Sequence, residues 1–305
     1  MAGIFSDPIV VKKMHSGGIS DCSDLYSSHE EADTRIILHA LYADKLFGLK
    51  NTKGRIIIKS PDTDVLILAV HFFPTFHNTK ELWFHTGSIT NTKDLRRYIP
   101  IHDICNTLNP VLCKVLPAAH ALTGCDTTSS FFGISKKTVY KVLKTNPDEF
   151  RDLVLLADCD VEDSLPTCRK LVAKLYDLKG KQASEHSNLN QLRVRLATRK
   201  NASLAKLPPC EATFKQHLLR SSLQTYIWMS ANVPQPPPKS PFTFGWEDND
   251  GLVPVFFKGQ MSSDFLQDLV CDCKSKSVCA SSCVCFEQSP ALISALVRER
   301  NFVKM

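Results

Sequence analysis

The chain has 305 residues, of which 43% are apolar, and its formal net charge is +6. This length and composition predict a proper hydrophobic core, organised as one large domain or two ordinary ones. Because it contains no run of about eighteen apolar residues and its first residues lack a basic flank before an apolar core, neither a membrane span nor a secretory signal is predicted. We therefore expect an intracellular protein whose twelve cysteines are reduced or metal-bound. The mild positive charge suits a polyanionic partner without requiring one.

The first predicted helix runs from Ser28 to about Phe47. Ser28 and Glu31 match a capping box, in which each side chain satisfies a free backbone N–H of the first turn. Acidic residues in a first turn are favoured by the helix dipole, so Glu30, Glu31 and Asp33 have a structural explanation as well as a functional one.

The stretch Ser60-Pro61-Asp62-Thr63-Asp64 places two carboxylates where a strand ends. Residues Arg55 to Lys59 predict a buried strand, and Val65 to Val70 begin a new apolar element. In open α/β sheets, ligands bind in the crevice at this position. A turn that favours aspartate is the alternative interpretation.

Further along the chain, strands and helices alternate. Leu82 to His85 predict a second strand, while Asp94 to Tyr98 and Ile101 to Leu108 predict helices. This alternation favours an α/β fold with a parallel sheet flanked by helices.

A glycine turn at Gly133 precedes an amphipathic helix, Lys136 to Leu143. A helix N-terminus that carries Lys136 and Lys137 after such a turn is a candidate phosphate site. His120 lies one helical turn before Gly124 and is interpreted as a packing residue rather than as one that orients a site.

Helical periodicity continues from Asp148 to about Tyr226, and a proline-rich segment, Pro234 to Pro241, then predicts a stiff linker. Beyond it, we expect a short strand or extended segment packed back on the helices. One helix of this region carries a basic face, which is either a solvated surface or a nucleic-acid contact. Its basic residues are Arg193, Arg195, Arg199 and Lys200.

Five cysteines cluster near the end of the sequence. Thiolates at such spacing are typical of zinc, which takes four soft ligands, so one site and a remainder are predicted. The five are Cys271, Cys273, Cys279, Cys283 and Cys285.

Carboxylates thus occur in three places: the start of the first helix, the end of the first long strand, and Asp126 before the glycine turn. If they converge, each ionised pair about 4 Å apart costs about 4 kcal/mol at an effective dielectric of about 20, so the cluster needs cations. Hard oxygen ligands select Mg²⁺ or Mn²⁺. Two-metal phosphodiester hydrolysis is the chemistry that uses such a site.

These motifs resemble, in their order, those of the PIN-like 5′-nucleases, which include flap endonuclease and the XPG repair nuclease. Glu31-Ala32-Asp33 is similar to the Glu-Ala-Glu of that family, and Ser60 to Asp64 to its Ser-Glu-Asp-x-Asp. Gly124-Cys125-Asp126 is similar to its Gly-x-Asp-Tyr, and Gly133 to Lys137 to its helix-two-turn-helix turn. The residues of these motifs resemble even more closely those of uncharacterised, mobile-element-derived animal proteins with a PIN-like domain and a cysteine-rich tail.

The resemblance implies a Mg²⁺- or Mn²⁺-dependent nuclease that acts on nucleic acid, DNA rather than RNA, in the nucleus. It implies that Asp62, Asp64 and Asp126 ligate metal and that Glu31 and Asp33 place metal or water. It also implies that Gly133, Lys136 and Lys137 hold the phosphate backbone. The alternatives are a catalytically inactive PIN-like module that binds nucleic acid or protein, and a structural or regulatory protein whose acids are caps and turns.

The sequence also departs from the family. The family's first strand carries an Asp and a later Phe-Asp-Gly supplies another acid, and neither occurs before Glu30. We therefore expect either the C-terminal part of a longer domain or a lineage that has lost catalysis. The cysteine-rich tail resembles the tesmin-type motif, which holds zinc and reads DNA, but lacks its second half.

The expected organisation has five parts. Residues 1–24 form a lead-in or truncated edge, and residues 25–145 form the PIN-like core, which lacks its N-terminal strand. A helical extension (146–232), the proline-rich linker (233–242) and a C-terminal segment with the degenerate cysteine motif (243–305) follow.

Overall fold

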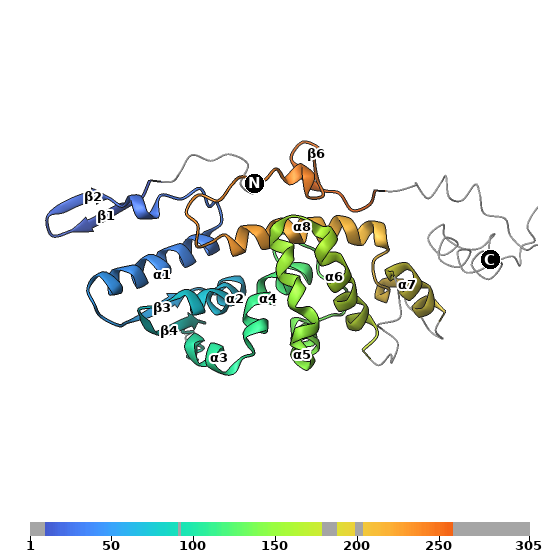
Figure 1. Cartoon of the computed structure of the whole chain (residues 1–305), viewed down its shortest axis with the longest axis horizontal. Helices are drawn as coiled ribbons and strands as arrows, with labels where there is room; N and C mark the ends of the chain where they lie inside the picture. The colour runs from blue at the N-terminus through green and yellow to red at the C-terminus, as the bar shows by residue number, and fades with distance from the viewer. Residues whose placement is uncertain (1–9, 91–92, 179–187, 199–203, 259–305) are drawn as a thin grey trace, which may run out of the picture.

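The computed structural model describes residues 10–90, 93–178, 188–198 and 204–258, and its fold is α/β (Figure 1). The main sheet contains β3 (Gly54–Lys59), β4 (Thr79–Thr86) and β5 (Arg97–Pro100), in that order. Strands β3 and β4 are parallel and are joined through helix α2 (Thr63–Phe72) and the short 3₁₀ helix η2 (Phe73–Thr75), which form a βαβ crossover. The βαβ unit expected from the sequence is therefore present.

The apolar side chains of the strands explain where the sheet core lies. Ile58 of β3 and Leu82 and Phe84 of β4 are buried, and they pack against Ile37 of helix α1 (Ala32–Leu49) and Leu68 of α2. Burial of large aliphatic and aromatic side chains is the main term that stabilises such a core. The same packing holds the N-terminal ends of α1 and α2 beside each other.

Strand β5 corrects two expectations, since the sheet is mixed and not parallel. Strand β5 pairs with β4 in the antiparallel direction, and it includes Tyr98, which was expected in a helix. The Tyr98 ring stacks on His85 of β4, its cross-strand neighbour, with ring centroids 4.4 Å apart. Such cross-strand pairs stabilise a sheet and outweigh local helix propensity here.

Helix α1 begins later than the capping box predicts. Its N-cap is Glu31, and no side chain caps the helix. Ser28 is instead in an extended segment, where its backbone N–H donates to the carbonyl of Pro234, while the ring of His29 hydrogen-bonds to Val233 at 2.8 Å. Contacts with a segment about 200 residues away therefore replace the local cap.

The rest of the described chain is mainly helical, as the periodicity predicted. Its α-helices are α3 (Ile101–Thr107), α4 (Pro110–Leu122), α5 (Lys136–Thr145), α6 (Val161–Tyr176), α7 (Leu189–Ala197) and α8 (Glu211–Met229). The 3₁₀ segments η3 (Pro147–Asp158) and η4 (Leu204–Lys206) connect them. None of the helices within the described ranges is long and apolar enough to cross a bilayer.

Helices α4 and α8 contribute side chains to two hydrophobic cores, one among the helices and one against the sheet. Leu122 and Phe214 pack in the helical core, whereas Ala121 and Trp228 pack in the core of the sheet. Figure 1 shows α8 running along α4 and α6 at one side of the molecule. The helical extension and the sheet are therefore packed together through these two helices.

Two β-hairpins are separate from the main sheet and the helices packed on it. Strands β1 (Lys12–His15) and β2 (Gly18–Asp21) are antiparallel and lead through the turn η1 (Ser23–Leu25) to α1. At the other end, the turn η5 (Pro241–Thr243) precedes the antiparallel strands β6 (Trp246–Asp248) and β7 (Leu252–Pro254).

The proline-rich segment contacts the body of the protein. The Tyr226 hydroxyl of α8 donates to the carbonyl of Pro237 at 2.6 Å, and Pro234 accepts from Ser28. The hairpin that follows it packs on α8, where Arg220 donates to the carbonyl of Gly245 at 3.0 Å. A short strand or an extended segment packed back on the helices was the expectation, and the two short strands of this hairpin confirm it.

The described residues of the basic helix face make intramolecular contacts. Arg193 donates to the carbonyl of Pro208, and Arg195 lies 3.1 Å from a carboxylate oxygen of Asp177. Arg199 and Lys200 lie outside the described residues, as do all five cysteines of the tail. The predicted zinc site at Cys271, Cys273, Cys279, Cys283 and Cys285 therefore stays a prediction.

A buried carboxylate that does not belong to the expected cluster holds α1 to the start of β4. Asp44 is 6% exposed and accepts hydrogen bonds from the backbone N–H groups of His77 and Asn78 and from the Thr79 hydroxyl, at 2.7–3.1 Å. We expect Asp44→Ala to lower the free energy of unfolding by about 3 kcal/mol, because the buried Thr79 hydroxyl and two partly buried backbone N–H groups lose their acceptor. Asp44→Asn, which keeps one acceptor oxygen, should lose less. Urea unfolding measures both, and a loss below about 1 kcal/mol in the alanine variant would contradict this role.

Candidate metal centre

The loop from β3 to α2 positions two carboxylates through a local hydrogen-bond pattern. Asp62 is the N-cap of α2, and its Oδ1 accepts from the backbone N–H of Asp64 at 2.9 Å. The hydroxyl of Ser60 accepts from the N–H of Asp62 at 3.0 Å. The interpretation as a turn that favours aspartate is therefore confirmed, and Asp62 also lies in a cluster of acids.

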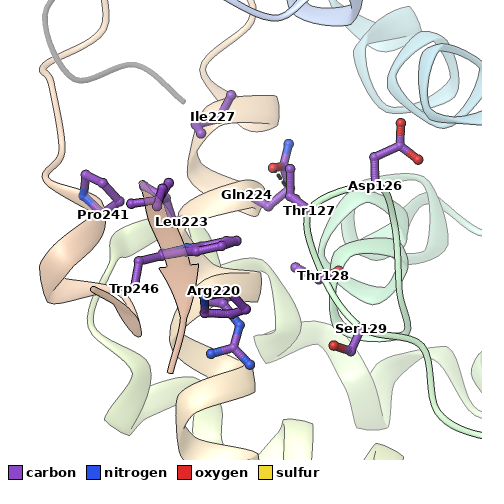
Figure 2. Close-up of a pocket in the computed structure, with 12 residues that line it drawn as sticks. Asp126, Thr127, Thr128, Ser129, Arg220, Leu223, Gln224, Ile227, Pro241 and Trp246 are labelled. Carbon is purple, nitrogen blue, oxygen red and sulfur yellow. Dashed lines mark hydrogen bonds between the residues drawn. The ribbon is translucent and has the colours of Figure 1, made fainter. Parts of the chain in front are cut away.

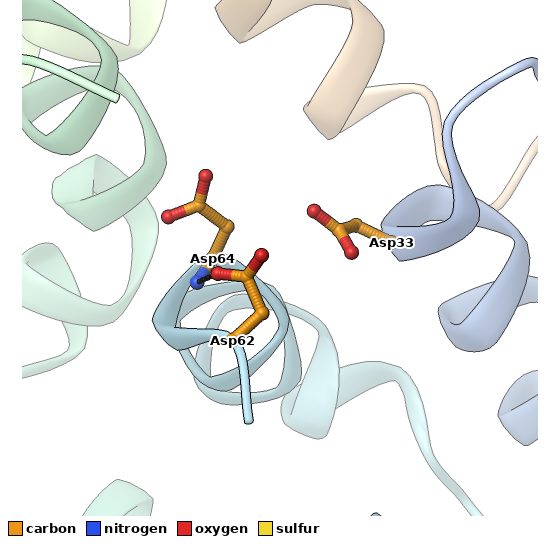
Figure 3. Close-up of side chains that lie close together, drawn as sticks. All are labelled: Asp33, Asp62 and Asp64. Carbon is orange, nitrogen blue, oxygen red and sulfur yellow. Dashed lines mark hydrogen bonds between the residues drawn. The ribbon is translucent and has the colours of Figure 1, made fainter. Parts of the chain in front are cut away.

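Asp33 completes the cluster from the first turn of α1. Figure 3 shows its carboxylate directed toward those of Asp62 and Asp64 across the space between α1 and α2. One oxygen from each of the three lies within 4.8 Å of the other two. Oxygen ligands of Mg²⁺ or Mn²⁺ lie about 2.1 Å from the ion, so small side-chain rotations would close these three around one cation. This cluster can hold a metal ion.

Burial and the charges of the cluster together raise the pKa of Asp33 to about 6. Desolvation is the largest cause, and repulsion from Asp62, Glu31, Asp64 and Asp126 adds to it. A cation among these carboxylates would relieve both effects. The cluster is thus electrostatically unfavourable alone and complementary to a divalent ion.

The elevated pKa of Asp33 predicts how stability depends on pH without metal. Because its folded pKa, about 6, lies above the ordinary value of 3.8, ionisation costs more in the folded state, and stability falls as pH rises from about 4 to about 6. We expect Asp33→Asn to be more stable than the unaltered protein at neutral pH by about 1 kcal/mol, after allowance for solvent screening. The difference should shrink at pH 4. Thermal unfolding in a chelator at both pH values measures it, and an equal difference at both would contradict the assignment.

His120 of α4 contacts the cluster directly. Its Nε2 lies 2.8 Å from Oδ1 of Asp64, and both side chains are nearly buried. The sequence interpretation assigned His120 to packing, and it does lie beside the ring of Trp228. The structure adds that it fixes the orientation of Asp64, as residues behind a metal ligand commonly do.

We expect His120→Ala to weaken the binding of Mn²⁺ by 10- to 100-fold, because Asp64 loses the partner that orients it. His102→Ala is a matched control, since that ring hydrogen-bonds to the carbonyl of Leu82 and not to the cluster. Calorimetric titration gives both affinities. Equal effects of the two substitutions would show that His120 has no special connection to the metal centre.

Glu31 lies next to the cluster but is directed toward α8. Its two oxygens accept from Nε2 of Gln224 at 3.0 and 3.1 Å, and one also accepts from Nε1 of Trp228 at 3.1 Å. Desolvation raises its pKa, with smaller contributions from Asp64 and Asp126, while the two donors oppose the shift. Glu31 therefore links α1 to α8 and adds negative charge to the site. The sequence analysis missed Gln224 and Trp228, because nothing local connects them to Glu31.

Asp126 lies on the rim of the site and is not a member of the tight cluster. It is exposed, in a turn in which the backbone groups of Cys125 and Thr128 hydrogen-bond to each other. Figure 2 shows its carboxylate directed away from Trp246. Its negative charge still adds a small contribution to the raised pKa values of Asp33 and Glu31.

The glycine turn and its lysines are arranged differently from the expected phosphate clamp. The Lys136 ammonium donates to the carbonyl of His120 at 2.7 Å, to the Thr123 hydroxyl at 3.1 Å and to the carbonyl of Gly124. Although the side chain as a whole is exposed, desolvation of this ammonium lowers the pKa of Lys136 to about 8. The Lys136 ammonium therefore caps the C-terminal end of α4, where the turn that carries Asp126 begins.

The other members of the expected clamp are exposed. Gly133 adopts a φ of +73°, which favours glycine, and Lys137 lies in the first turn of α5. Of the two lysines, Lys137 is thus the one whose position leaves it open to a phosphate.

Comparisons with protein-family models, with curated proteins and with solved structures found no match to this chain. The resemblance to PIN-like nucleases therefore rests on the motifs in the sequence and stays a prediction.

Proposed function

We propose that this protein is a divalent-metal-dependent phosphodiesterase of the PIN-like type that acts on nucleic acid, with DNA the favoured substrate. The observation that carries the proposal is the convergence of Asp33, Asp62 and Asp64, which come from two different helices. The order of the acidic motifs, which resembles that of the PIN-like 5′-nucleases, supports the same reaction class.

The chain's own residues have distinct roles in this proposal. Asp33, Asp62 and Asp64 would hold Mg²⁺ or Mn²⁺, and His120 keeps Asp64 oriented through its 2.8 Å contact. When bound, such an ion lowers the pKa of water and neutralises charge on the scissile phosphate. Asp126, exposed on the rim, would accept a proton from water that approaches the site.

A catalytically inactive module that binds nucleic acid or protein is the second candidate. The observation that favours it is that three of the five expected acids form the tight cluster. Glu31 is held by Gln224 and Trp228, and Asp126 lies on the rim. Such a site holds one cation more readily than two.

A cleavage assay separates the two candidates. The full chain should cleave a single-stranded or branched DNA in the presence of Mn²⁺, and Asp64→Asn and Asp126→Asn should lose that activity. Asp103→Asn, a substitution at an exposed acid of α3, is the matched control and should cleave normally. Intact Mn²⁺ binding without cleavage would favour the inactive module over the enzyme.

A further inference from the structure

A cavity of about 650 Å³ lies beside the metal centre, between α8, the turn that carries Asp126, and the hairpin of β6 and β7 (Figure 2). Cavities of this size are typical of small-molecule and cofactor sites. Its walls combine the apolar side chains of Leu223 and Ile227 and the ring of Trp246 with polar groups of Arg220 and Thr127. Of the residues described for the metal centre, Asp126 and Gln224 also line this cavity.

Arg220 gives the cavity a buried positive charge. The side chain is 3% exposed, and among the described residues no carboxylate lies within ion-pair distance of it. Its guanidinium donates to the carbonyls of Gly245 and Val255 and lies 5.9 Å from the ring centre of Trp246. Carbonyl dipoles and rings compensate a buried cation only in part, so this wall favours an anionic ligand.

Trp246 provides a flat apolar surface in the same cavity. The ring is half-buried, and Figure 2 shows it in the wall formed by the hairpin, across from the turn of Thr127 and Thr128. Aromatic rings of this kind bind nucleobases by stacking, whatever the base. A planar ring joined to an anion is the ligand that fits both Trp246 and Arg220.

Gln224 connects the cavity to the metal centre. Its Nε2 donates to Glu31 on one side, and its Oε1 accepts from the Thr127 hydroxyl at 2.6 Å on the other. The side chain is 4% exposed, so it forms part of the wall that the two sites share. A ligand in the cavity would therefore lie next to the acidic cluster.

We propose that this cavity binds one unpaired nucleotide of a single-stranded nucleic acid, with its base against Trp246 and its phosphate toward the wall that contains Arg220. The inference rests on the proposed function, since it places a nucleotide next to the bond to be cleaved. A base that is stacked and paired in a duplex cannot enter the cavity. The substrate is therefore single-stranded, or has a strand that is splayed out at this position.

Tryptophan fluorescence of the full chain tests the proposal with adenosine monophosphate and a short single-stranded oligonucleotide as probes. We expect both to quench the emission of Trp246 and the oligonucleotide to bind more tightly than the blunt duplex of the same sequence. Trp246→Ala should weaken the binding of the single strand about tenfold, as measured by anisotropy of a labelled strand, because base stacking is lost. Trp246→Phe should retain most of the affinity.

Phe242→Ala is the matched control, since this exposed aromatic side chain lies close to the hairpin but does not line the cavity. Circular dichroism shows that each variant is folded. Equal affinity of Trp246→Ala and the unaltered protein, or equal binding of single strand and duplex, would overturn the proposal.

The two proposals fail in different ways. The variant Asp62→Asn/Asp64→Asn should bind adenosine monophosphate normally if the cavity is a nucleotide site, even though it cannot bind metal. Nucleotide binding without cleavage would therefore leave the cavity site standing and contradict the enzyme. Metal-dependent cleavage that is unchanged by Trp246→Ala would contradict the cavity site alone.

Discussion

Replacing Asp62 and Asp64 together by asparagine should abolish the binding of Mg²⁺ or Mn²⁺ that calorimetry detects in the unaltered protein. The two residues supply two of the three oxygens that converge within 4.8 Å, and hard divalent cations bind neutral amides far less tightly than carboxylates. We expect at least a 100-fold loss of affinity. Asparagine caps a helix as well as aspartate does, so α2 should still begin at Thr63 and the variant should fold.

The control for this experiment is a pair of acids outside the site. Asp103→Asn/Asp148→Asn removes the same charge from exposed positions on α3 and η3 and should leave metal affinity unchanged. Unchanged binding in the variant at Asp62 and Asp64 would show that the cation binds elsewhere.

Replacing Trp228 by alanine should lower the free energy of unfolding by about 3–5 kcal/mol, the largest loss of stability that we expect from one substitution. The side chain is 2% exposed in the sheet core, and its Nε1 donates to Glu31. Trp228→Phe keeps most of the packing and removes only that hydrogen bond, so it should lose about 1–2 kcal/mol. Urea unfolding with an unchanged denaturant slope measures both values.

Trp83→Ala is the control for Trp228. This indole is half-buried in β4 and donates to Glu81, which is also half-buried, so its loss should be clearly smaller. A similar loss for the two tryptophans would contradict the position of Trp228 as the link between α8 and α1.

Elements determined by local patterns were predicted well from the sequence. The run Ile56-Ile57-Ile58 and the Ser-Pro-Asp that follows it predicted β3 and its end, and the carboxylates of Asp62 and Asp64 lie where that pattern placed them. A run of β-branched residues and an aspartate N-cap leave signals within a few residues, and this is why the sequence reveals them. The predicted burial of the strand is met only at Ile58, because Ile57 is exposed on the other face.

Features that depend on distant partners could not be predicted in this way. The start of α1 is set by hydrogen bonds from the segment of Ser28 and His29 to the chain after α8, and β5 is held by the stacking of Tyr98 on His85. No local pattern records such contacts. For the same reason, the sequence could not show that the ammonium of Lys136 binds the carbonyl groups at the end of α4.

The candidate site also depends on contacts between residues that are far apart in the sequence. No local pattern places Asp33 near Asp62 and Asp64, whose convergence the sequence analysis could state only as a condition, and the structure brings the three together through the packing of α1 on α2. Gln224 lies in the sequence far from the acids that it borders, on a helix whose periodicity predicted only packing.

Anomalous diffraction at the manganese absorption edge, from crystals of the full chain soaked in Mn²⁺, tests the metal centre most directly. We expect a peak about 2.2 Å from carboxylate oxygens of Asp33, Asp62 and Asp64, and its absence in crystals of Asp64→Asn. A map with no peak among these three carboxylates, or with peaks only at other positions, would contradict the metal centre and the phosphodiesterase activity proposed from it.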